Sequence, residues 1–314
     1  MAEILLQTPD NPLPEGITAA YLSARDGVHL RYAILKAPGS RGTAVLLTGR
    51  NESIEKYFET MRDLAARGFT TAIFDWRGQG GSDRLLRDPR RGHVERFDAY
   101  AQDLDQFFEE VVLPDCRPPY NVLAHSMGAL IALSAADKLV NRVRRMVLLA
   151  PPLTFSAPMS MKWLKRLAGF YFALGLGSRY LPGTKRRGVL PPFKGNRLTT
   201  DVERFTRNQN IVRAHPQLGL GGPTAAWIYA ACLATEQVRE PDFMASVRIP
   251  TLFIAAGADQ VVSTPAVERY ARHLRSGSSI TVDGARHEML QETDLYREQV
   301  IAAFAAFAKT GEIA

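Results

Sequence analysis

The sequence predicts an α/β fold in which a mostly parallel sheet is covered by helices on both faces. Short apolar runs typical of buried strands alternate with stretches of helical spacing over residues 1–150 and again over residues 246–314. From 151 to 245, prolines, glycines and helical patches replace this alternation. We therefore expect one α/β core built from the two outer parts, with residues 151–245 inserted as a helical lid. The 314 residues, 46% of them hydrophobic, are enough for a large core.

Apolar runs bounded by turn residues predict the strands. They lie at residues 17–23, 28–35, 43–48, 70–74, 120–123, 145–149, 249–255 and 279–282. Asp26-Gly27 separates the first two runs, which predicts an antiparallel hairpin. Apolar residues at helical spacing predict helices at 54–67, 97–112, 129–136, 159–174, 224–238, 265–274 and 294–309. Both ends of the insertion leave the same edge of the sheet, so the lid is expected over the strand ends.

The stretch around Ser126 predicts a nucleophile. An apolar strand is followed there by a helix rich in Ala and Leu, and so sharp a bend requires small residues two before and two after the serine. Ala124 and Gly128 occupy those positions, which makes a G-x-S-x-G nucleophile elbow with Ala in the first glycine position. The pentapeptide alone is equally compatible with an ordinary serine at a helix start, so its partners decide between the two.

A serine hydroxyl needs a base beside it, and His287 is the predicted base. It follows the last strand on a loop at the carboxyl edge of the sheet, where the elbow also opens. His93 is the rival, although a structural or substrate-contact role suits it better. Asp259, at the end of the last strand but one, is the predicted acid, with Asp283 as its competitor. The chain order Ser126, Asp259, His287 is that of the α/β-hydrolase fold.

The tetrahedral intermediate of acyl transfer needs two hydrogen-bond donors for its oxyanion. One predicted donor is the backbone N–H of Met127, directly after the nucleophile. The other is the backbone N–H of Arg50, in the loop after the strand at 43–48. Gly49 precedes it and supplies the backbone freedom that the loop needs.

No cofactor and no metal are expected. The glycine-rich run at 78–81 is separated from its strand by other residues and is not followed by a helix, which excludes a dinucleotide fingerprint. Cys116 and Cys232 match no metal-ligand or redox spacing and are expected to be free thiols. The N-terminus lacks the pattern of a signal peptide, and no run approaches the roughly 20 apolar residues that span a bilayer. We expect a cytoplasmic protein, or one peripheral to the inner face of the cytoplasmic membrane.

The net charge of +7 is unevenly distributed along the chain. Between Lys138 and Thr200 there are thirteen Lys and Arg residues and no Asp or Glu, so the remainder is mildly acidic. Such a block attracts anionic surfaces such as phospholipid headgroups or nucleic acid, although a solvated basic face is the alternative. One helix in this block combines Trp163, Leu167 and Phe170 with basic residues, which is typical of a helix that lies in a membrane interface. The alternative is that its apolar residues pack on the core.

Motifs spread from about residue 17 to 308 resemble the bacterial lysophospholipase and monoacylglycerol lipase family. They are the runs at 49–53, 56–57, 75–80, 82–86, 91–94, 125–128 and 221–224, the last followed by Trp227. The resemblance implies a serine hydrolase with a mobile helical lid that cleaves the acyl ester of single-chain lipids through an acyl-enzyme. It also implies substrate contacts at Gly49, His125 and Trp227. Ala124 for Gly and Thr48 for His depart from the family pattern, and neither change removes a reacting group.

Two other functions remain as alternatives. One is a general carboxylesterase or thioesterase with the same triad and no lipid preference. The other is a catalytically silent membrane-binding protein, against which the ordered Ser, Asp and His argue. The expected partners are a lipid or ester substrate and, peripherally, an anionic membrane, with no nucleic acid.

Overall fold

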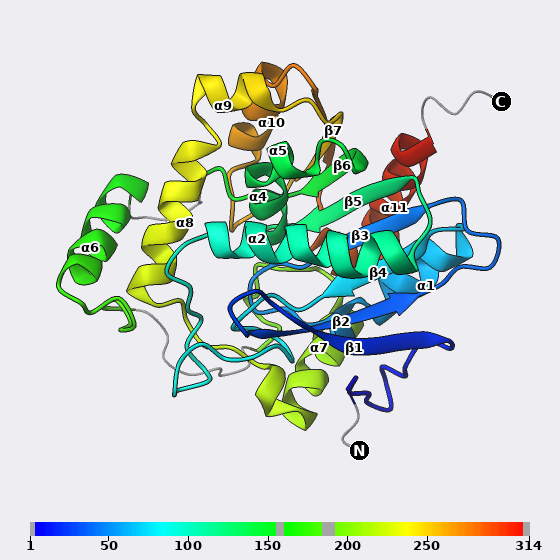
Figure 1. Cartoon of the computed structure of the whole chain (residues 1–314), viewed down its shortest axis with the longest axis horizontal. Coiled ribbons are helices and arrows are strands. Elements are labelled where there is room, and N and C mark those ends of the chain that lie inside the picture. The colour runs from blue at the N-terminus through cyan, green and yellow to red at the C-terminus, as the bar shows by residue number, and fades with distance from the viewer. Residues whose placement is uncertain (1–3, 155–159, 184–191, 310–314) are drawn as a thin grey trace.

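Among the described residues, the protein forms an eight-stranded sheet in the order β1-β2-β4-β3-β5-β6-β7-β8 (Figure 1). The structure, a computed structural model, describes residues 4–154, 160–183 and 192–309. β1 pairs with β2 and β2 with β4 in antiparallel orientation, whereas the later pairs are parallel. The strands are β1 Ile17–Ser23, β2 His29–Leu35, β3 Thr43–Leu47, β4 Thr70–Phe74, β5 Tyr120–His125, β6 Val143–Leu149, β7 Thr251–Ala256 and β8 Gly277–Val282. The predicted α/β fold is confirmed.

Helices cover both faces of this sheet. The α-helices are α1 Phe58–Ala66, α2 Asp98–Phe107, α3 Leu113–Asp115, α4 Met127–Ser134, α5 Ala136–Leu139, α6 Met161–Ala173, α7 Val202–Ala214, α8 Ala225–Gln237, α9 Pro241–Ser246, α10 Thr264–His273 and α11 Asp294–Lys309. Buried residues of α2, α4 and α10 pack on one face, and those of α1 and α11 pack on the other. Because β3, β4 and β5 are buried on both faces, their sequences are continuous apolar runs rather than alternating ones.

The apolar pattern does not predict α7 and α9, nor the short helices α3 and α5. In α7 only Phe205 and Ile211 are buried, so the helix has no wide apolar stripe. Its start is stabilised instead by a cap, because the Asp201 carboxylate accepts a hydrogen bond of 2.8 Å from the backbone N–H of Arg204. The α9 helix is short and begins with proline at its first position.

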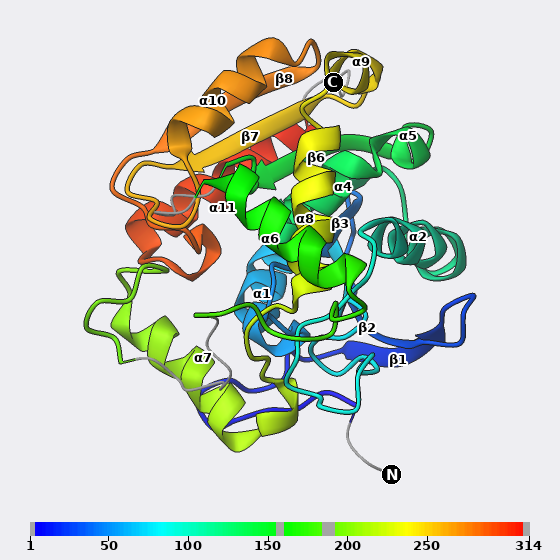
Figure 2. The same ribbon diagram turned by 90° about the vertical axis from the view of Figure 1, so that its left-hand side faces the viewer.

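Helices α6 to α9 all lie between β6 and β7 in the sequence, where the lid is expected. Over Ala225–Ala234, α8 carries apolar residues on all sides, and most of them are buried. Ala230 and Ala234 on one side of α8 join the main core, whereas Ile228 and Cys232 on another pack against α6. α6 therefore lies on the outer side of α8 (Figure 2). The division of the chain at 150/151 and 245/246 stays a prediction.

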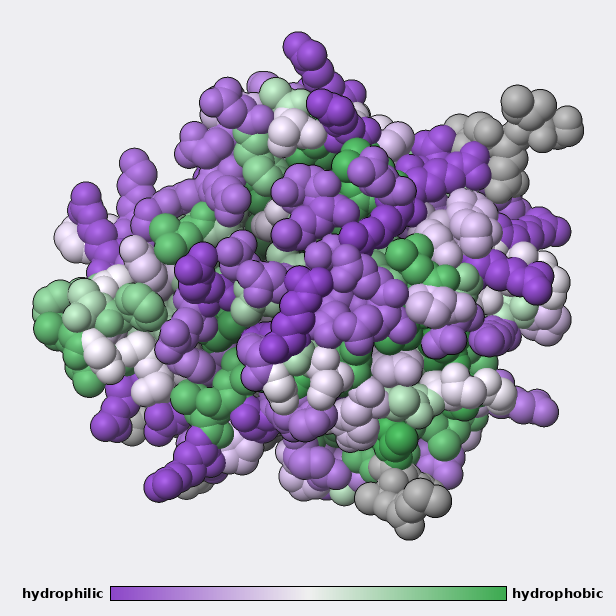
Figure 3. Space-filling view, viewed as in Figure 1, coloured by the Kyte–Doolittle hydropathy of each residue, from purple (hydrophilic) through white to green (hydrophobic). Residues whose placement is uncertain are grey.

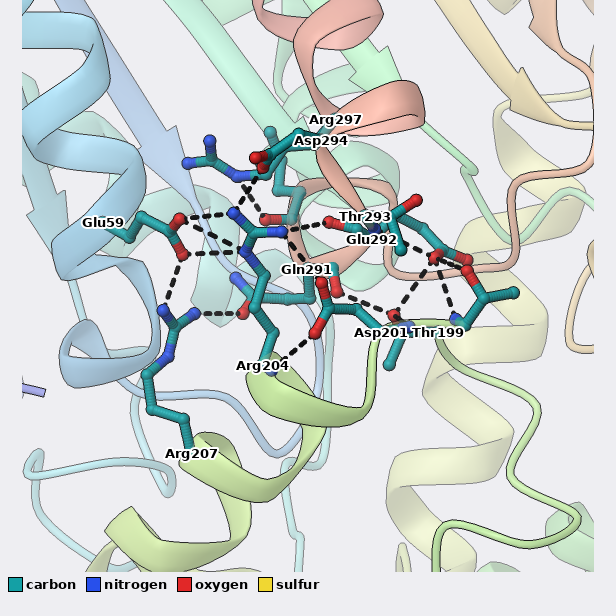
Figure 4. A network of polar contacts seen from close by, with 12 residues as sticks. Glu59, Thr199, Asp201, Arg204, Arg207, Gln291, Glu292, Thr293, Asp294 and Arg297 are labelled. Atoms are coloured by element: carbon teal, nitrogen blue, oxygen red, sulfur yellow. Dashed lines mark hydrogen bonds and ion pairs between the residues drawn. The ribbon is translucent and has the colours of Figure 1, made fainter. Parts of the chain in front are cut away.

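An ionic network attaches α7 to the core (Figure 4). The Arg204 guanidinium donates to Glu59 of α1 and to Asp294 of α11, both at 2.6 Å. Arg207, one turn later, donates to the same Glu59 at 2.6 Å. Burial opposes ionisation of Glu59, but the guanidinium groups of Arg204, Arg297 and Arg207 outweigh it and lower the pKa of this carboxyl to about 2. Because Glu292 and Asp294 follow the loop of His287, this network ties α7 to the segment that carries the predicted base.

Candidate active site

Ser126 lies at the bend between β5 and α4, with φ 49° and ψ −113°. A non-glycine residue adopts this backbone conformation only at an energetic cost, which surrounding structure must offset. The Ser126 N–H donates to the Leu149 carbonyl of β6 at 2.9 Å and fixes the bend to the sheet. A Cβ at Gly128 would lie 2.5 Å from the Leu47 carbonyl oxygen, so only glycine fits there. The structure thus contains the sharp strand-to-helix turn that the elbow motif requires.

The three predicted triad residues come together at the carboxyl ends of their strands. Ser126 Oγ lies 3.0 Å from His287 Nε2, and His287 Nδ1 lies 2.8 Å from Asp259 Oδ2. His287 and the Asp259 side chain are buried. In this arrangement Nδ1–H donates to the carboxylate, which leaves Nε2 to accept the serine proton. The arrangement can activate Ser126 as a nucleophile.

The second oxygen of Asp259 is held by backbone donors. Its Oδ1 accepts hydrogen bonds from the N–H groups of Val261 at 2.7 Å and Val262 at 3.0 Å. Burial opposes ionisation, but His287 and these two donors outweigh it and lower the pKa of Asp259. The carboxyl group therefore stays ionised at neutral pH and can stabilise an imidazolium on His287. Asp283, the competitor, is exposed.

His93, the rival base, is placed elsewhere. Its Nδ1 lies 2.9 Å from the hydroxyl of Thr224, which also accepts a bond from the Trp227 N–H at 3.3 Å and so caps α8. Gly92 donates to the Gly222 carbonyl, and its own carbonyl accepts from the Thr224 N–H. These bonds join the loop at 91–94 to the start of α8. His93 thus contacts α8, in the segment where the lid is expected.

A pocket of about 350 Å³ opens above Ser126. Both expected oxyanion donors, Arg50 and Met127, line it together with Ser126 and His287. The N–H of Met127 is the first of α4 and has no acceptor within its own helix. Trp227 of α8 also lines the pocket, where its ring packs against Phe97 with centroids 5.5 Å apart. The remaining apolar wall is formed by Leu130, Pro152, Leu198, Ala231 and Val261.

The other two expected substrate contacts, Gly49 and His125, form hydrogen bonds to other residues of the protein. The Gly49 N–H donates to Glu52, and Gly49 is not among the residues that line the pocket. His125 lines the pocket, but its Nε2 lies 3.0 Å from the His287 carbonyl oxygen and its Nδ1 lies 3.3 Å from Glu52. Since both partners are acceptors, both ring nitrogens must carry protons. Burial opposes this charge, but Glu52 outweighs it and raises the pKa of His125.

Glu52 is a buried residue of the site that the sequence reasoning missed. Its carboxylate accepts from Lys56 Nζ at 2.8 Å and from the Tyr57 hydroxyl at 2.6 Å, besides Gly49 and His125. Lys56 also pairs with Glu288, next to the predicted base, at 2.8 Å. This network connects the loop after β3 to the His287 loop, and both Glu52 and Glu288 line the pocket. The run at 49–53 contains Glu52, yet no spacing in the sequence indicates its partners.

The glycine-rich loop at 78–81 folds around a side chain of the protein itself. The N–H of Gly81 donates to the Asp75 carboxylate at 2.7 Å, and Arg31 pairs with the same carboxylate at 2.6 Å. A Cβ at Gly80 would lie 2.2 Å from the Asp75 carboxyl carbon. Within the described ranges, no cluster of three or more His, Cys, Asp or Glu is arranged to hold a metal ion. Among the same residues, no helix is both long and apolar enough to cross a bilayer.

A family model and two curated relatives match most of this chain. A family model described as serine aminopeptidase, S33, matches residues 38–294, a range that contains all three triad positions. The chain is 32% identical over 296 residues to lysophospholipase L2 of Escherichia coli (strain K12), covering 90% of this chain and 84% of that protein. It is 29% identical to a probable lysophospholipase L2 of Haemophilus influenzae, covering 92% of this chain and 91% of that protein.

Solved structures share the fold at lower identity. A soluble variant of monoglyceride lipase from Saccharomyces cerevisiae has a TM-score of 0.75 at 20% identity, covering 94% of this chain and 96% of that one. A thermostable carboxyl esterase from Bacillus coagulans has a TM-score of 0.76 at 18% identity, covering 94% and 98%. The family match spans most of the chain, and the lysophospholipase L2 match covers 90% of it. The chain therefore belongs to the serine aminopeptidase S33 family of α/β-hydrolases, together with the lysophospholipase L2 proteins.

Proposed function

We propose that this protein is a serine hydrolase that cleaves the acyl ester of single-chain lipids, lysophospholipids or monoacylglycerols. The observation that carries the proposal is the hydrogen-bonded chain from Ser126 through His287 to Asp259 at the floor of a largely apolar pocket. The similarity to lysophospholipase L2 over 90% of the chain supports the lipid substrate. The apolar wall that includes Phe97, Leu130 and Trp227 suits one acyl chain.

The reaction proceeds in two halves. Ser126 Oγ attacks the ester carbonyl carbon while His287 Nε2 takes the hydroxyl proton, and the Arg50 and Met127 N–H groups stabilise the oxyanion. His287 then returns the proton to the departing glycerol oxygen, which leaves an acyl-enzyme on Ser126. Water, deprotonated by His287, attacks that ester, and the fatty acid leaves as His287 returns the proton to Ser126 Oγ. Asp259 keeps the imidazole in the reactive orientation throughout.

A hydrolysis panel tests this proposal against the general carboxylesterase or thioesterase. The panel contains lysophosphatidylethanolamine, lysophosphatidylcholine, a monoacylglycerol, an acyl thioester and short p-nitrophenyl esters. We expect the highest kcat/KM on a long single-chain lipid, because its acyl chain fills the apolar wall and a short ester does not. A preference for short esters or the thioester would support the alternative instead. A catalytically silent protein would not react with a serine-directed fluorophosphonate, so labelling of the serine separates it from both enzymes.

The proposed function includes peripheral contact with an anionic membrane through α6. The apolar stripe expected there is divided in the structure: Leu164, Leu167 and Tyr171 pack towards α8. In contrast, Trp163 is 64% exposed and Phe170 59% exposed. This exposed patch, which also includes Phe172, Leu174 and Leu176, appears green and pale over α6 in Figure 3. Exposed apolar groups of this size on one helix are typical of a lipid-facing surface.

Two basic residues beside the patch supply the charge for such a contact. Lys162 and Arg166 are exposed, and the Arg166 guanidinium lies 5.5 Å from the Trp163 ring centre. Lys165 is less available because it forms an ion pair with Glu236 of α8. Each free basic residue near an anionic surface contributes about 1 kcal/mol, and salt screens that attraction.

Co-sedimentation with liposomes tests the contact. Binding is expected to require anionic lipid, to weaken with salt, and to fall in a Lys162→Glu/Arg166→Glu variant and in a Trp163→Ser/Phe170→Ser variant. Arg272→Glu/Arg275→Glu makes the same charge change on α10 and at its end, away from α6, and serves as the control. Equal binding to neutral and anionic liposomes would contradict the assignment of this surface to membrane contact. A loss of binding in the control as large as that in the α6 variants would contradict it too.

A further inference from the structure

The Arg50 side chain is a cation of the pocket with an unused hydrogen-bond donor. Its Nη2 donates to the Gly221 carbonyl, and its guanidinium carbon lies 5.5 Å from the centre of the Trp227 ring. Its buried Nε has no hydrogen-bond partner among the described residues. A Cβ at Gly92 would lie 2.8 Å from Arg50 Nη2, so this glycine leaves room for the guanidinium. The side chain is thus held in one place at the wall of the pocket.

Within the described chain, no carboxylate pairs with Arg50, although two carboxylates line the same pocket. Glu52 and Glu288 are each bound by Lys56 at 2.8 Å, and Glu52 is also bound by His125. Burial lowers the pKa of Arg50 to about 10, which still leaves the group charged at neutral pH. A desolvated guanidinium without an anion is costly, so an anionic group on a ligand would stabilise it.

We propose that Arg50 binds the phosphate of a lysophospholipid head group and makes the enzyme selective for lysophospholipids over monoacylglycerols. The inference rests on the proposed function, because it places the ester carbonyl at the N–H groups of Arg50 and Met127. The glycerol unit that joins this ester to the phosphate is short, so with the carbonyl at these N–H groups the phosphate stays within reach of the side chain of the same Arg50. A guanidinium binds phosphate oxygens through several N–H groups at once, and a monoacylglycerol offers only a hydroxyl there.

The selectivity is measured as a ratio in Arg50→Gln and Arg50→Lys variants. The ratio of kcat/KM for lysophosphatidylethanolamine to kcat/KM for the monoacylglycerol with the same acyl chain is expected to fall by about tenfold or more in Arg50→Gln. The ratio is expected to fall less in Arg50→Lys, which keeps the charge but lacks the planar fork of N–H donors. If Arg50 merely tethers Gly221 and Trp227, both rates fall together and the ratio stays constant. A constant ratio would overturn the proposal.

A second measurement does not depend on which lipid is cleaved. Glycerophosphoethanolamine is expected to slow fluorophosphonate labelling of Ser126 in the wild type and not in Arg50→Gln, with glycerol as the uncharged control. Equal protection by inorganic phosphate would assign the site to free phosphate and overturn the head-group assignment. Absence of protection by any phosphate compound would overturn the proposal too. If labelling is protected as expected but no lysophospholipid is hydrolysed, the proposed function fails while the phosphate site stands.

Discussion

Replacing Ser126 by Ala is expected to lower turnover by about 10³- to 10⁶-fold and to leave the fold intact. The change removes the nucleophilic oxygen, whose hydrogen bond in the structure is to His287. The bend itself is retained, because the bond from the Ser126 N–H to the Leu149 carbonyl involves only the backbone. Steady-state kinetics on the best substrate of the panel check the loss of turnover. The thermal unfolding midpoint of the same preparation checks that the fold is retained.

Ser134→Ala is the matched control for this prediction. Ser134 is the last residue of α4, and its hydroxyl donates to the Leu130 carbonyl at 2.8 Å. The control therefore makes the same substitution in the same helix without touching the pocket, and its turnover should equal that of the wild type. Ester cleavage by Ser126→Ala at a rate close to wild type would refute the mechanism.

Asp259→Asn is expected to lower kcat by about 10³- to 10⁴-fold, whereas Asp283→Asn should leave it unchanged. The carboxylate of Asp259 accepts the Nδ1–H of His287 at 2.8 Å. An amide carries no negative charge and can favour the wrong tautomer, so the imidazolium formed during attack loses its stabilisation. Asp283 lies at the end of β8 and is exposed.

The comparison of the two variants uses the same substitution at two aspartates that follow the neighbouring strands β7 and β8. Purified proteins are compared for kcat on one substrate, and near-ultraviolet circular dichroism verifies that packing is unchanged. A large loss in Asp283→Asn with normal turnover in Asp259→Asn would move the acid to Asp283. Because the pKa of Asp259 is lowered, acidification should not impair wild-type activity through this group until the pH falls below the ordinary range of an aspartate.

The chain order of the triad and the position of the elbow could be predicted because their constraints are local. A strand that bends into a helix at Ser126 requires small neighbours, and Gly128 meets the Leu47 carbonyl at a distance that no side chain tolerates. Strand ends of a parallel sheet meet at one edge, so residues that follow β5, β7 and β8 converge there. Neither prediction requires knowledge of how individual side chains pack.

The α6 helix illustrates what the same reasoning could not decide. Apolar residues at helical spacing predict a helix with an apolar face, but they do not say what covers that face. Leu167 packs towards α8, whereas Trp163 and Phe170 of the same expected stripe are exposed. The difference depends on where α8 lies, and α8 is placed by its own contacts with the core.

By itself the sequence determined the α/β fold, the serine at the elbow and the two side chains expected to activate it, because each follows from short-range pattern or strand order. Only the tertiary structure decided the partners of buried charges. Glu52 lies between His125 and Lys56, while Arg50 in the same pocket pairs with no carboxylate of the residues that the structure describes. Such pairing depends on which loops the fold brings into contact across long stretches of chain, and the cost of leaving a buried charge unpaired appears only once those contacts exist.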